Sequence, residues 1–276
     1  MYLLFDIGGT KTRVAISTDG QTISEPIIFD TSQNFEEGIK NITDAANQLT
    51  DNQPIQAAAG GIREVLDSTK SMLINSADIS KIPDWVGKPL REKLEESLKI
   101  NILLENDSAM AALGEATHGA GMGKDIIAFL TVSTGVGGAR IVKGRIDAKA
   151  LVFEPGDQII DSKETLVYLG DTISGPSLER IYGQKPENID DPKIWSEVAK
   201  KLAVGLNNMI VFWSPDIVVL GGGVVKSLSL EEINSHLKNM LIKCPAVPPL
   251  IKASLGEMSG LFGALEYLKQ KLTLQQ

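Results

Sequence analysis

The chain opens on two hydrophobic patterns that both favour β-strands. Residues 2–7 form a short apolar run, and residues 12–17 alternate between apolar and polar side chains. Gly8-Gly9-Thr10 lies between these stretches and predicts a turn, because glycine adopts backbone conformations closed to other residues. A further strand is expected at residues 27–29. The first thirty residues therefore predict three consecutive strands.

A helical pattern follows. Apolar side chains between residues 35 and 49 recur at the 3.6-residue period, so they fall on one helix face. Asn34 stands where a cap is needed, and Glu37 follows three residues later. A fourth strand is expected over residues 54–59, and Gly60-Gly61 predicts its end.

Helix caps and apolar stretches also predict the elements in the rest of the chain. Asp191-Pro192 marks a helix start, with Asp as the cap and Pro in the first turn. Ser229 and Glu232 form a capping box for a later helix. The other expected elements are helices over residues 89–99, 106–117 and 259–271, and strands over residues 100–105, 126–132, 139–142 and 217–220.

Two segments of the chain share one pattern. "LLFDIGGTKTRVAIS" and "AFLTVSTGVGGARIVKG" each read as strand, polar glycine turn and strand. The repeat is about 125 residues, much longer than a solenoid period, so it predicts two similar α/β domains. No low-complexity linker separates them, and we expect them to share a cleft. We place one domain at residues 1–107 plus 262–276 and the other at residues 108–261.

Composition narrows the function classes. Of 276 residues, 43% are hydrophobic and 22% are charged, as in ordinary globular proteins. The formal charge of −8 argues against a partner such as nucleic acid or an anionic membrane, since these attract basic faces. A single cysteine, Cys244, excludes an internal disulfide and a multi-cysteine metal site. No apolar run reaches the length of a membrane span and the start does not resemble a signal peptide, so a cytoplasmic protein is expected.

The two glycine turns are the first candidate for chemistry. Glycines between strands let backbone amides approach phosphate oxygens, and Thr10 and Lys11 add a hydroxyl donor and a charge. Asp6, at a strand end, can face a hydrated Mg²⁺. Thr134-Gly135-Val136-Gly137-Gly138 repeats the first turn in the second half. Such turns are also common in plain hairpins, and that alternative stays open.

Asn106 and Asp107 are the second candidate, at a strand end and helix start. A carboxylate there can accept a hydroxyl proton while Asn106 orients the substrate. Both residue types are also preferred helix caps, and position alone favours the cap. Glu115, on the same helix, either orients the site or is solvated. Gly221, Gly222 and Gly223 follow a buried strand and leave room for a flat ring such as adenine.

Taken together, these residues resemble a known family. "FDIGGTKTRVAI", "ENDSAMAALGEA", "LTVSTGVGGARIVKGR", "VVLGGGVV" and "SLGEMSGLFGALEYL" are similar, in order and spacing, to segments of the ROK family (repressors, open reading frames, sugar kinases). The resemblance covers nearly the whole chain. It implies two duplicated actin-like ATPase (ribonuclease H-like) domains. No helix-turn-helix precedes Met1, so we expect the kinase branch of the family rather than the repressor branch.

The resemblance also implies roles for single positions. It matches Asp107 to the catalytic base, and Asn106, Gly60 and Gly61 to the sugar site. It matches Asp6, Gly8, Gly9, Thr10 and Lys11 to the first phosphate segment, Thr134, Gly135 and Gly137 to the second, and Gly221, Gly222 and Gly223 to the adenosine segment. ATP and Mg²⁺ are the implied cofactors, with Asp6 reaching the metal through water. Family members are usually dimers or tetramers, so we expect a homodimer.

The chain departs from the family on the sugar side. Glu154-Pro155-Gly156-Asp157 aligns with a Glu-x-Gly-His motif, so Asp157 stands where the family has a histidine that contacts the sugar and binds zinc. No cysteine or histidine follows in the expected loop, and we expect no zinc site. Gly170 stands where the family has a further sugar-binding glutamate. Glu154 and Asp157 remain the expected substrate contacts in this motif.

The resemblance therefore implies an ATP-dependent kinase that transfers the γ-phosphoryl group to a hydroxyl of glucose, a related hexose or an N-acetylhexosamine. Asp107 would act as general base. Two alternatives stay open: a non-catalytic sugar or nucleotide sensor of the same fold, and a kinase for a non-sugar acceptor. The acceptor, the phosphorylated hydroxyl and the donor preference are not fixed by the sequence.

Overall fold

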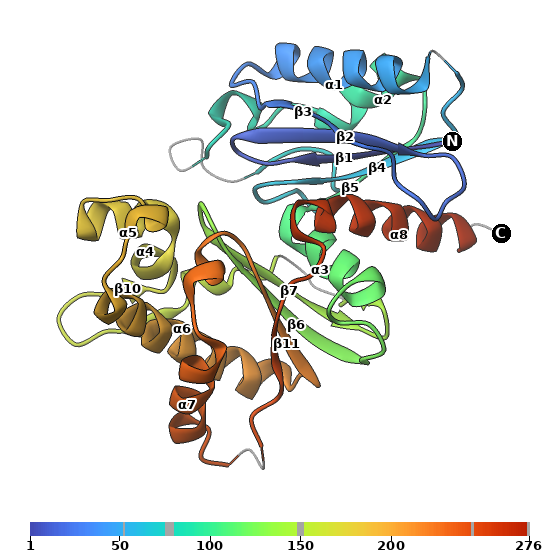
Figure 1. The fold of residues 1–276 in the computed structure, drawn as a ribbon. Coiled ribbons are helices and arrows are strands. Elements are labelled where there is room, and N and C mark those ends of the chain that lie inside the picture. The colour runs from blue at the N-terminus through green and yellow to red at the C-terminus, as the bar shows by residue number, and fades with distance from the viewer. Residues whose placement is uncertain (52, 75–79, 148–151, 244–245, 275–276) are drawn as a thin grey trace. The chain divides into compact units, whose positions relative to one another are not determined.

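The chain folds into two compact units. The computed structural model describes residues 1–51, 53–74, 80–147, 152–243 and 246–274, so Cys244 lies outside the described residues. The first unit contains Met1–Thr117 and the C-terminal segment that begins at Glu257, and nearly all of the chain between them forms the second. Each unit is built on one five-stranded mixed sheet. Figure 1 shows both sheets with their helices.

The sheet of the first unit has the strand order β3-β2-β1-β4-β5. Strand β1 pairs antiparallel with β2 and parallel with β4, and β4 pairs parallel with β5. The strands are β1 Tyr2–Ile7, β2 Lys11–Ser17, β3 Ile27–Asp30, β4 Ala57–Ile62 and β5 Ile102–Asn106. The helices are α1 Phe35–Thr50, α2 Leu90–Leu98, α3 Asp107–His118 and α8 Ser259–Thr273. The predicted order of strands and helices is confirmed.

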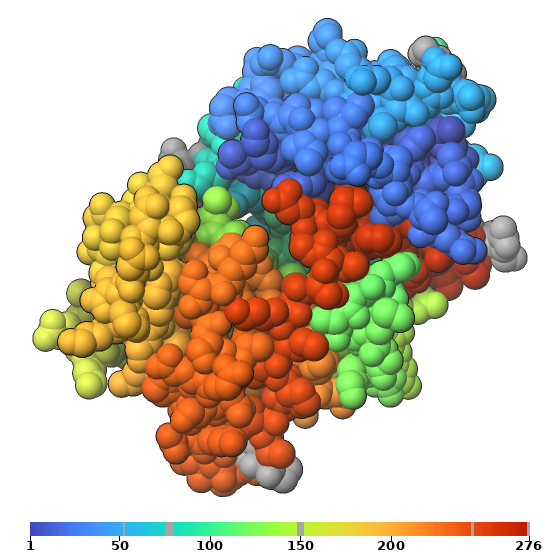
Figure 2. All heavy atoms as spheres, in the orientation of Figure 1, coloured from blue at the N-terminus to red at the C-terminus, as the bar shows by residue number. Residues whose placement is uncertain are grey.

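Strand β1 is buried on both faces because helices cover both. Leu3 and Phe5 pack with the apolar stripe of α1, in which Phe35 and Ile42 are almost fully buried. Helix α8 contacts β1 and β4, and in Figure 2 its red atoms lie directly against the blue N-terminal atoms. The near-continuous apolar run of β1, unlike the alternation in β2, reflects this two-sided burial.

The predicted cap of α1 is confirmed, with one change. Asn34 Oδ1 accepts a hydrogen bond from the Glu37 backbone N at 3.0 Å. The Glu37 carboxylate does not bind the Asn34 backbone N directly, as it would in a capping box. It accepts from the Ser32 hydroxyl at 2.7 Å, and the Ser32 hydroxyl oxygen accepts from the Asn34 backbone N at 3.0 Å. Ser32 therefore links the two halves of the cap.

The second sheet repeats the first. Its strand order is β12-β11-β6-β7-β8. Strand β6 pairs antiparallel with β7 and parallel with β11, and β11 pairs parallel with β12. Read from β6, the strand directions match those read from β1, which confirms the predicted duplication. The strands are β6 Ile126–Val132, β7 Val136–Val142, β8 Arg145–Ile146, β11 Ile217–Gly221 and β12 Leu250–Lys252.

Helices and a small hairpin complete the second unit. Asp191 caps α6 by accepting from the Lys193 backbone N at 2.8 Å, and Ser229 caps α7 by accepting from the Glu232 backbone N at 3.2 Å, as predicted. The elements are β9 Ile159–Asp161, β10 Val167–Tyr168, α4 Gly170–Ile173, α5 Gly175–Tyr182, α6 Pro192–Trp213 and α7 Leu230–Met240. Leu202, Leu206 and Val218 lie in the core between α6 and the sheet. No described helix is long and apolar enough to cross a bilayer.

The predicted end of the fourth strand is wrong. Gly60 and Gly61 lie inside β4 and are buried. A Cβ atom built on Gly60 would lie 2.0 Å from the Phe5 ring, and one on Gly61 would lie 3.0 Å from the Asp107 Cα. Glycine is therefore required at Gly60 by close packing inside a strand, where the sequence pattern indicated a turn.

The second glycine turn is also shorter than predicted. Gly137 and Gly138 belong to β7, where they pair with Thr131 and Leu130. The turn closes at residues 133–135, where the Ser133 backbone N donates to the Gly135 carbonyl at 2.9 Å. Gly222 does occupy a glycine-specific conformation, with φ of +92°.

The compact units divide after Thr117 and before Glu257. Helix α3 stays with the first unit because it packs closely on α8. A Cβ atom on Gly114 would lie 2.1 Å from the Ser259 carbonyl oxygen. The domain boundaries expected after residue 107 and before residue 262 stay a prediction.

Candidate functional site

The β1–β2 turn is fixed by backbone and hydroxyl contacts. The Gly8 backbone N donates to the Lys11 carbonyl at 3.0 Å, and the Thr31 hydroxyl donates to the Gly8 carbonyl at 2.7 Å. Thr10 is exposed. The Lys11 amine pairs with Asp30 at 2.7 Å across β2 and β3, both side chains being at least half exposed. Phosphate binding by the turn and by Lys11 stays a prediction.

Gly9 lies under two cationic side chains. A Cβ atom built on Gly9 would lie 2.9 Å from Lys81 Cβ and 3.1 Å from Arg63 Cδ. The turn therefore accepts these two side chains only because residue 9 is glycine. Neither cation is among the residues that the sequence pattern predicts for the site. Arg63 directly follows β4, and the recognisable signal was a charged pair, Arg63-Glu64, directly after a buried strand.

Asp6 lies on β1 opposite Arg13 of β2. Arg13 Nη1 is 3.7 Å from Asp6 Oδ2, and Arg13 Nη2 donates to Glu257 at 2.7 Å. Burial raises the pKa of Asp6 to about 7, the negative charge of Asp107 adds to this rise, and Arg13 opposes it. A further cation near Asp6 would lower this pKa, because a cation stabilises the charged form of a carboxyl group.

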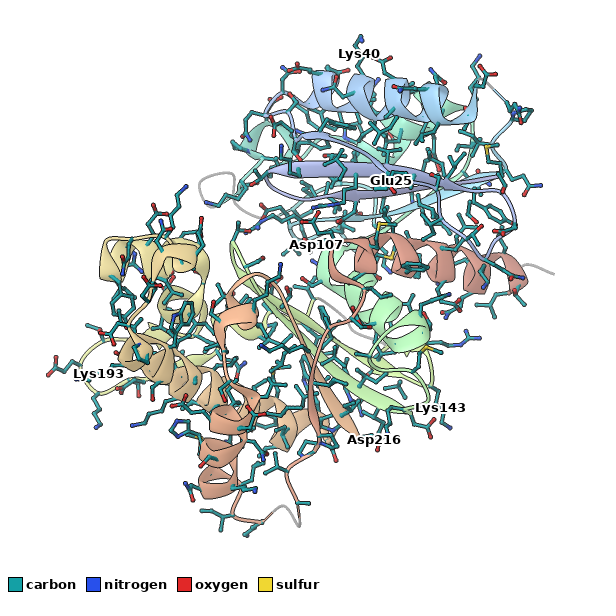
Figure 3. The ribbon with its side chains drawn as sticks, viewed as in Figure 1. Glu25, Lys40, Asp107, Lys143, Lys193 and Asp216 are labelled. Atoms are coloured by element: carbon teal, nitrogen blue, oxygen red, sulfur yellow. The ribbon has the colours of Figure 1, made fainter. Side chains whose placement is uncertain are left out.

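Asp107 begins α3 immediately after β5, as labelled in Figure 3. Its Oδ1 accepts from the Ser108 backbone N at 2.7 Å. Burial raises the pKa of Asp107, while the guanidinium of Arg63 and the Ser108 hydrogen bonds lower it. A raised pKa makes the ionised Asp107 carboxylate a stronger proton acceptor than an ordinary aspartate.

Asn106 supplies the cap of α3. Its Oδ1 accepts from the Ala109 backbone N at 3.1 Å, and its Nδ2 donates to the Glu64 carbonyl at 3.4 Å. The cap interpretation is therefore confirmed for Asn106. Asp107 is the next residue along, in the first turn of the helix. A role of Asn106 in substrate orientation stays a prediction.

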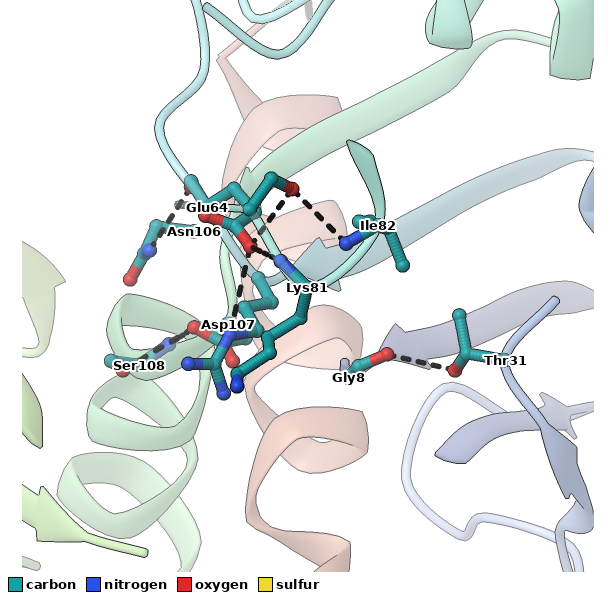
Figure 4. Close-up of polar contacts among 10 residues, drawn as sticks. Gly8, Thr31, Glu64, Lys81, Ile82, Asn106, Asp107 and Ser108 are labelled. Carbon is teal, nitrogen blue, oxygen red and sulfur yellow. Dashed lines mark hydrogen bonds and ion pairs between the residues drawn. The ribbon is translucent and has the colours of Figure 1, made fainter. Parts of the chain in front are cut away.

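Glu64 joins the two segments that cover the turn, as Figure 4 shows. Glu64 Oε1 accepts from the Lys81 backbone N at 3.0 Å and from the Ser80 hydroxyl at 3.2 Å. Arg63 Nε lies 3.8 Å from the same oxygen. The close-up also shows the Lys81 side chain running toward Asp107.

The carboxylate of Glu105 is buried and contacts the end of β5. Glu105 is 3% exposed; its Oε1 accepts from the Asn106 backbone N at 3.0 Å. Its Oε2 pairs with the Lys70 amine, which also donates to the Tyr267 hydroxyl at 3.0 Å. Glu115 is fully buried and hydrogen-bonded to the Ser259 hydroxyl at 3.1 Å, so its expected solvated alternative is wrong.

In the second unit, another set of residues predicted for the site lies close together. Pro155–Asp157 forms a short 3₁₀ turn against β7, since a Cβ atom on Gly156 would lie 2.6 Å from the Val136 carbonyl oxygen. A Cβ atom on Gly170 would lie 3.3 Å from the Gly156 carbonyl oxygen. The Gly175 backbone N donates to the Ser133 carbonyl at 2.7 Å. The Glu154–Asp157 motif, Gly170 and the Thr134-Gly135 turn therefore lie around one end of β7.

The glycine triplet is split by the structure. Gly221 ends β11, Gly222 turns with positive φ, and Gly223 precedes a 3₁₀ turn. A Cβ atom on Gly223 would meet nothing within 4 Å. Adenosine binding at Gly221, Gly222 and Gly223 stays a prediction. Within the described ranges no group of three or more metal-ligating side chains occurs, and the expected lack of zinc also stays a prediction.

The free energy of unfolding of the metal-free protein will depend on pH through Asp6. The carboxyl titrates near 3.8 when unfolded and at about 7 when folded. Between these values the folded protein holds a proton that the unfolded chain has lost, so stability falls as the pH rises from about 4 to about 7. Asp6→Asn removes the buried charge and will stabilise the protein more at about pH 8 than at about pH 4. Urea unfolding in chelator measures both; equal stabilisation at the two pH values would contradict the prediction.

Comparison with known proteins identifies the family. The chain matches the ROK family profile over residues 2–271, and it belongs to that family. It is 27% identical to a ROK hexokinase from Thermus thermophilus whose crystal structure superposes with a TM-score of 0.83, covering 98% of this chain and 99% of that one.

Two further relatives cover almost the whole chain. A putative fructokinase of Bacillus subtilis is 25% identical over an alignment of 288 positions, which covers 97% of this chain and 95% of the relative. A ROK family glucokinase from Streptomyces griseus, solved in complex with glucose and AMPPNP, is 24% identical with a TM-score of 0.79, covering 98% of this chain and 99% of that one. The predicted resemblance to the ROK family and the α/β fold are confirmed.

Proposed function

We propose that this protein is an ATP-dependent sugar kinase that transfers the γ-phosphoryl group to a hydroxyl of a hexose or N-acetylhexosamine. The observation that carries the proposal is Asp107, a partly buried carboxylate with raised pKa at the start of α3, in the same unit as the β1–β2 turn. The names of the hexokinase and fructokinase relatives support the acceptor class.

Asp107 acts as general base. Its Oδ1 is engaged by the Ser108 backbone N at 2.7 Å, which fixes the carboxylate in place. The acceptor hydroxyl gives its proton to this carboxylate as its oxygen attacks the γ-phosphorus, and the bond to the β-phosphate oxygen breaks. Transfer of this kind depends on positioning and charge more than on covalent chemistry.

The donor side is proposed as ATP with Mg²⁺. The amides of Gly8, Gly9 and Thr10, with Lys11, bind phosphate oxygens in the first unit. Thr134, Gly135 and Gly137 do so in the second, where Gly221, Gly222 and Gly223 take the adenosine. Asp6 fits a magnesium site for two reasons. Carboxylate oxygens are suitable ligands for this ion, and burial destabilises the charged form of Asp6, which a bound cation would stabilise. Bound there through water, Mg²⁺ would neutralise charge on the phosphates.

The acceptor side is proposed as Asn106, Glu154 and Asp157, with Gly60 and Gly61 contributing through strand β4. Gly61 allows the Asp107 Cα to approach the strand closely. Asp157 and Gly170 stand where the family has histidine and glutamate, which favours an acceptor bound differently from glucose in other members. A kinase for a non-sugar acceptor is therefore the alternative. A non-catalytic sensor would have no use for a general base at this position. The expected homodimer stays a prediction.

ADP release from Mg-ATP, measured against a panel of hexoses, N-acetylhexosamines and non-sugar alcohols, tests the proposal. Sugar-dependent release supports it and identifies the acceptor. Release with a non-sugar alcohol alone favours the alternative kinase. ATP binding without turnover on any acceptor would overturn the kinase and favour a sensor.

A further inference from the structure

Arg63 is anchored beside the phosphate turn by its backbone. It follows β4, and its backbone N donates to the Ile7 carbonyl at 2.9 Å. Ile7 is the last residue before Gly8, so the two chain segments leave the sheet together. The Arg63 side chain then lies across the turn, with Cδ 3.1 Å from the position of a Cβ atom on Gly9.

The same side chain acts on the base. The positive charge of Arg63 lowers the pKa of Asp107, against the larger effect of burial. Arg63 therefore lies within electrostatic reach of Asp107 and in contact with Gly9. A phosphoryl group that moves from a nucleotide at the turn to a hydroxyl at Asp107 must pass between these two points.

Glu64 holds this arrangement at a cost in backbone strain. Its φ is +91°, a backbone conformation that residues other than glycine rarely adopt. Such strain persists where surrounding contacts demand it, and it is common at functional sites. Here the Glu64 carboxylate, 12% exposed, binds the Ser80 hydroxyl, the Lys81 backbone N and the Arg63 guanidinium through one oxygen.

We infer that Arg63 binds the transferred phosphoryl group, with Glu64 as its positioning residue and Lys81 as a second cation beside it. This inference rests on the proposed kinase function. Arg63 stays protonated throughout and supplies charge and hydrogen bonds to the phosphoryl oxygens, while the proton of the acceptor goes to Asp107. Such charge neutralisation is strongest where the site is shielded from water.

An acceptor with its own acid group is the competing ligand for these cations. The contact with Gly9 favours the phosphoryl group, because that contact places Arg63 on the nucleotide side. The two ligands predict different kinetic changes, and one binding measurement separates them without any turnover.

Binding of AMP-PNP and of ADP to the full-length protein, each with Mg²⁺, is compared for wild type and Arg63→Ala. Only AMP-PNP carries a γ-phosphoryl group. We expect its Kd to rise about tenfold while that of ADP stays near wild type, as for one charged hydrogen bond lost. Arg145→Ala, an exposed arginine on β8, is the matched control. An unchanged ratio of the two Kd values in Arg63→Ala would overturn the inference.

Kinetics with the acceptor from the panel give the second readout. Arg63→Ala should lower kcat about 10²- to 10³-fold with the acceptor KM nearly unchanged. Arg63→Lys should recover part of that loss. A raised acceptor KM with unchanged kcat would instead mean that Arg63 binds an acidic acceptor, and the inference would fail.

Glu64→Gln tests the positioning role. It keeps acceptors for Ser80 and Lys81 but loses the charge that holds Arg63, so kcat should fall to a value between wild type and Arg63→Ala with the melting temperature unchanged. An unchanged kcat would remove Glu64 from the proposal. If wild type turns over no acceptor but the AMP-PNP to ADP ratio still depends on Arg63, the kinase proposal fails and the phosphoryl contact stands.

Discussion

Asp107→Asn will lower the rate of phosphoryl transfer about 10²- to 10⁴-fold, because an amide cannot take the proton of the attacking hydroxyl. The substitution keeps the shape of the side chain, and its amide oxygen can still accept from the Ser108 backbone N, which lies 2.7 Å from Oδ1. The cap of α3 is also untouched, since Asn106 provides it. Binding of Mg-AMP-PNP should therefore remain at the wild-type level.

Stability gives an independent check of the same variant. Burial raises the pKa of Asp107, so the folded protein stabilises its neutral form relative to its charged form. At neutral pH, Asp107→Asn should therefore melt at or above the temperature of the wild type. Asp44→Asn, on the exposed face of α1, is the matched control and should leave turnover unchanged. Turnover of Asp107→Asn within a few fold of wild type would show that another group is the base.

Gly263→Ala will strongly destabilise the first unit, although it adds only one methyl group. A Cβ atom at residue 263 would lie 1.7 Å from the Met110 carbonyl oxygen, a backbone atom that no rotamer change can move. Helices α3 and α8 must separate to admit the methyl group. We expect a loss of about 3 kcal/mol or more in the free energy of unfolding, at the upper end of overpacking effects.

Urea unfolding followed by circular dichroism measures this loss. Thr273→Ala, exposed in the last turn of α8, is the control and should unfold near the wild-type midpoint. If Gly263→Ala yields no folded protein, Gly114→Ala tests the same contact from α3, where the Cβ atom would lie 2.1 Å from the Ser259 carbonyl oxygen. A wild-type midpoint for either glycine variant would mean that the helices are not in close contact.

Much of the local structure could be predicted because its causes are local. Strand β1, helix α1 and the Asn34 cap depend on neighbours a few residues away, and periodicity records them. The repeat of strand, turn and strand in the two halves likewise lies within short segments, so it predicted two sheets of like topology.

The errors fall where a distant contact decides. Gly60 resembles a turn residue in the sequence, but the Phe5 ring on the neighbouring strand requires a glycine there. Glu115 resembles a solvated helix residue, yet its partner Ser259 is 144 positions away along the chain. The arrangement of Arg63 and Glu64 was missed because it depends on Ser80 and Lys81, which lie 16 and 17 positions beyond Glu64 along the chain.

The placement of α8 constrains the order in which the protein can be built. This helix is synthesised after the whole second unit, yet it covers one face of a sheet whose β1 is synthesised before that unit. The second unit, by contrast, is complete once Gly256 has emerged. Domains fold as units during synthesis, so the inserted unit should reach its native state before α8 is available to the first unit. The first unit must therefore keep one apolar sheet face uncovered until the second unit and then α8 have been synthesised.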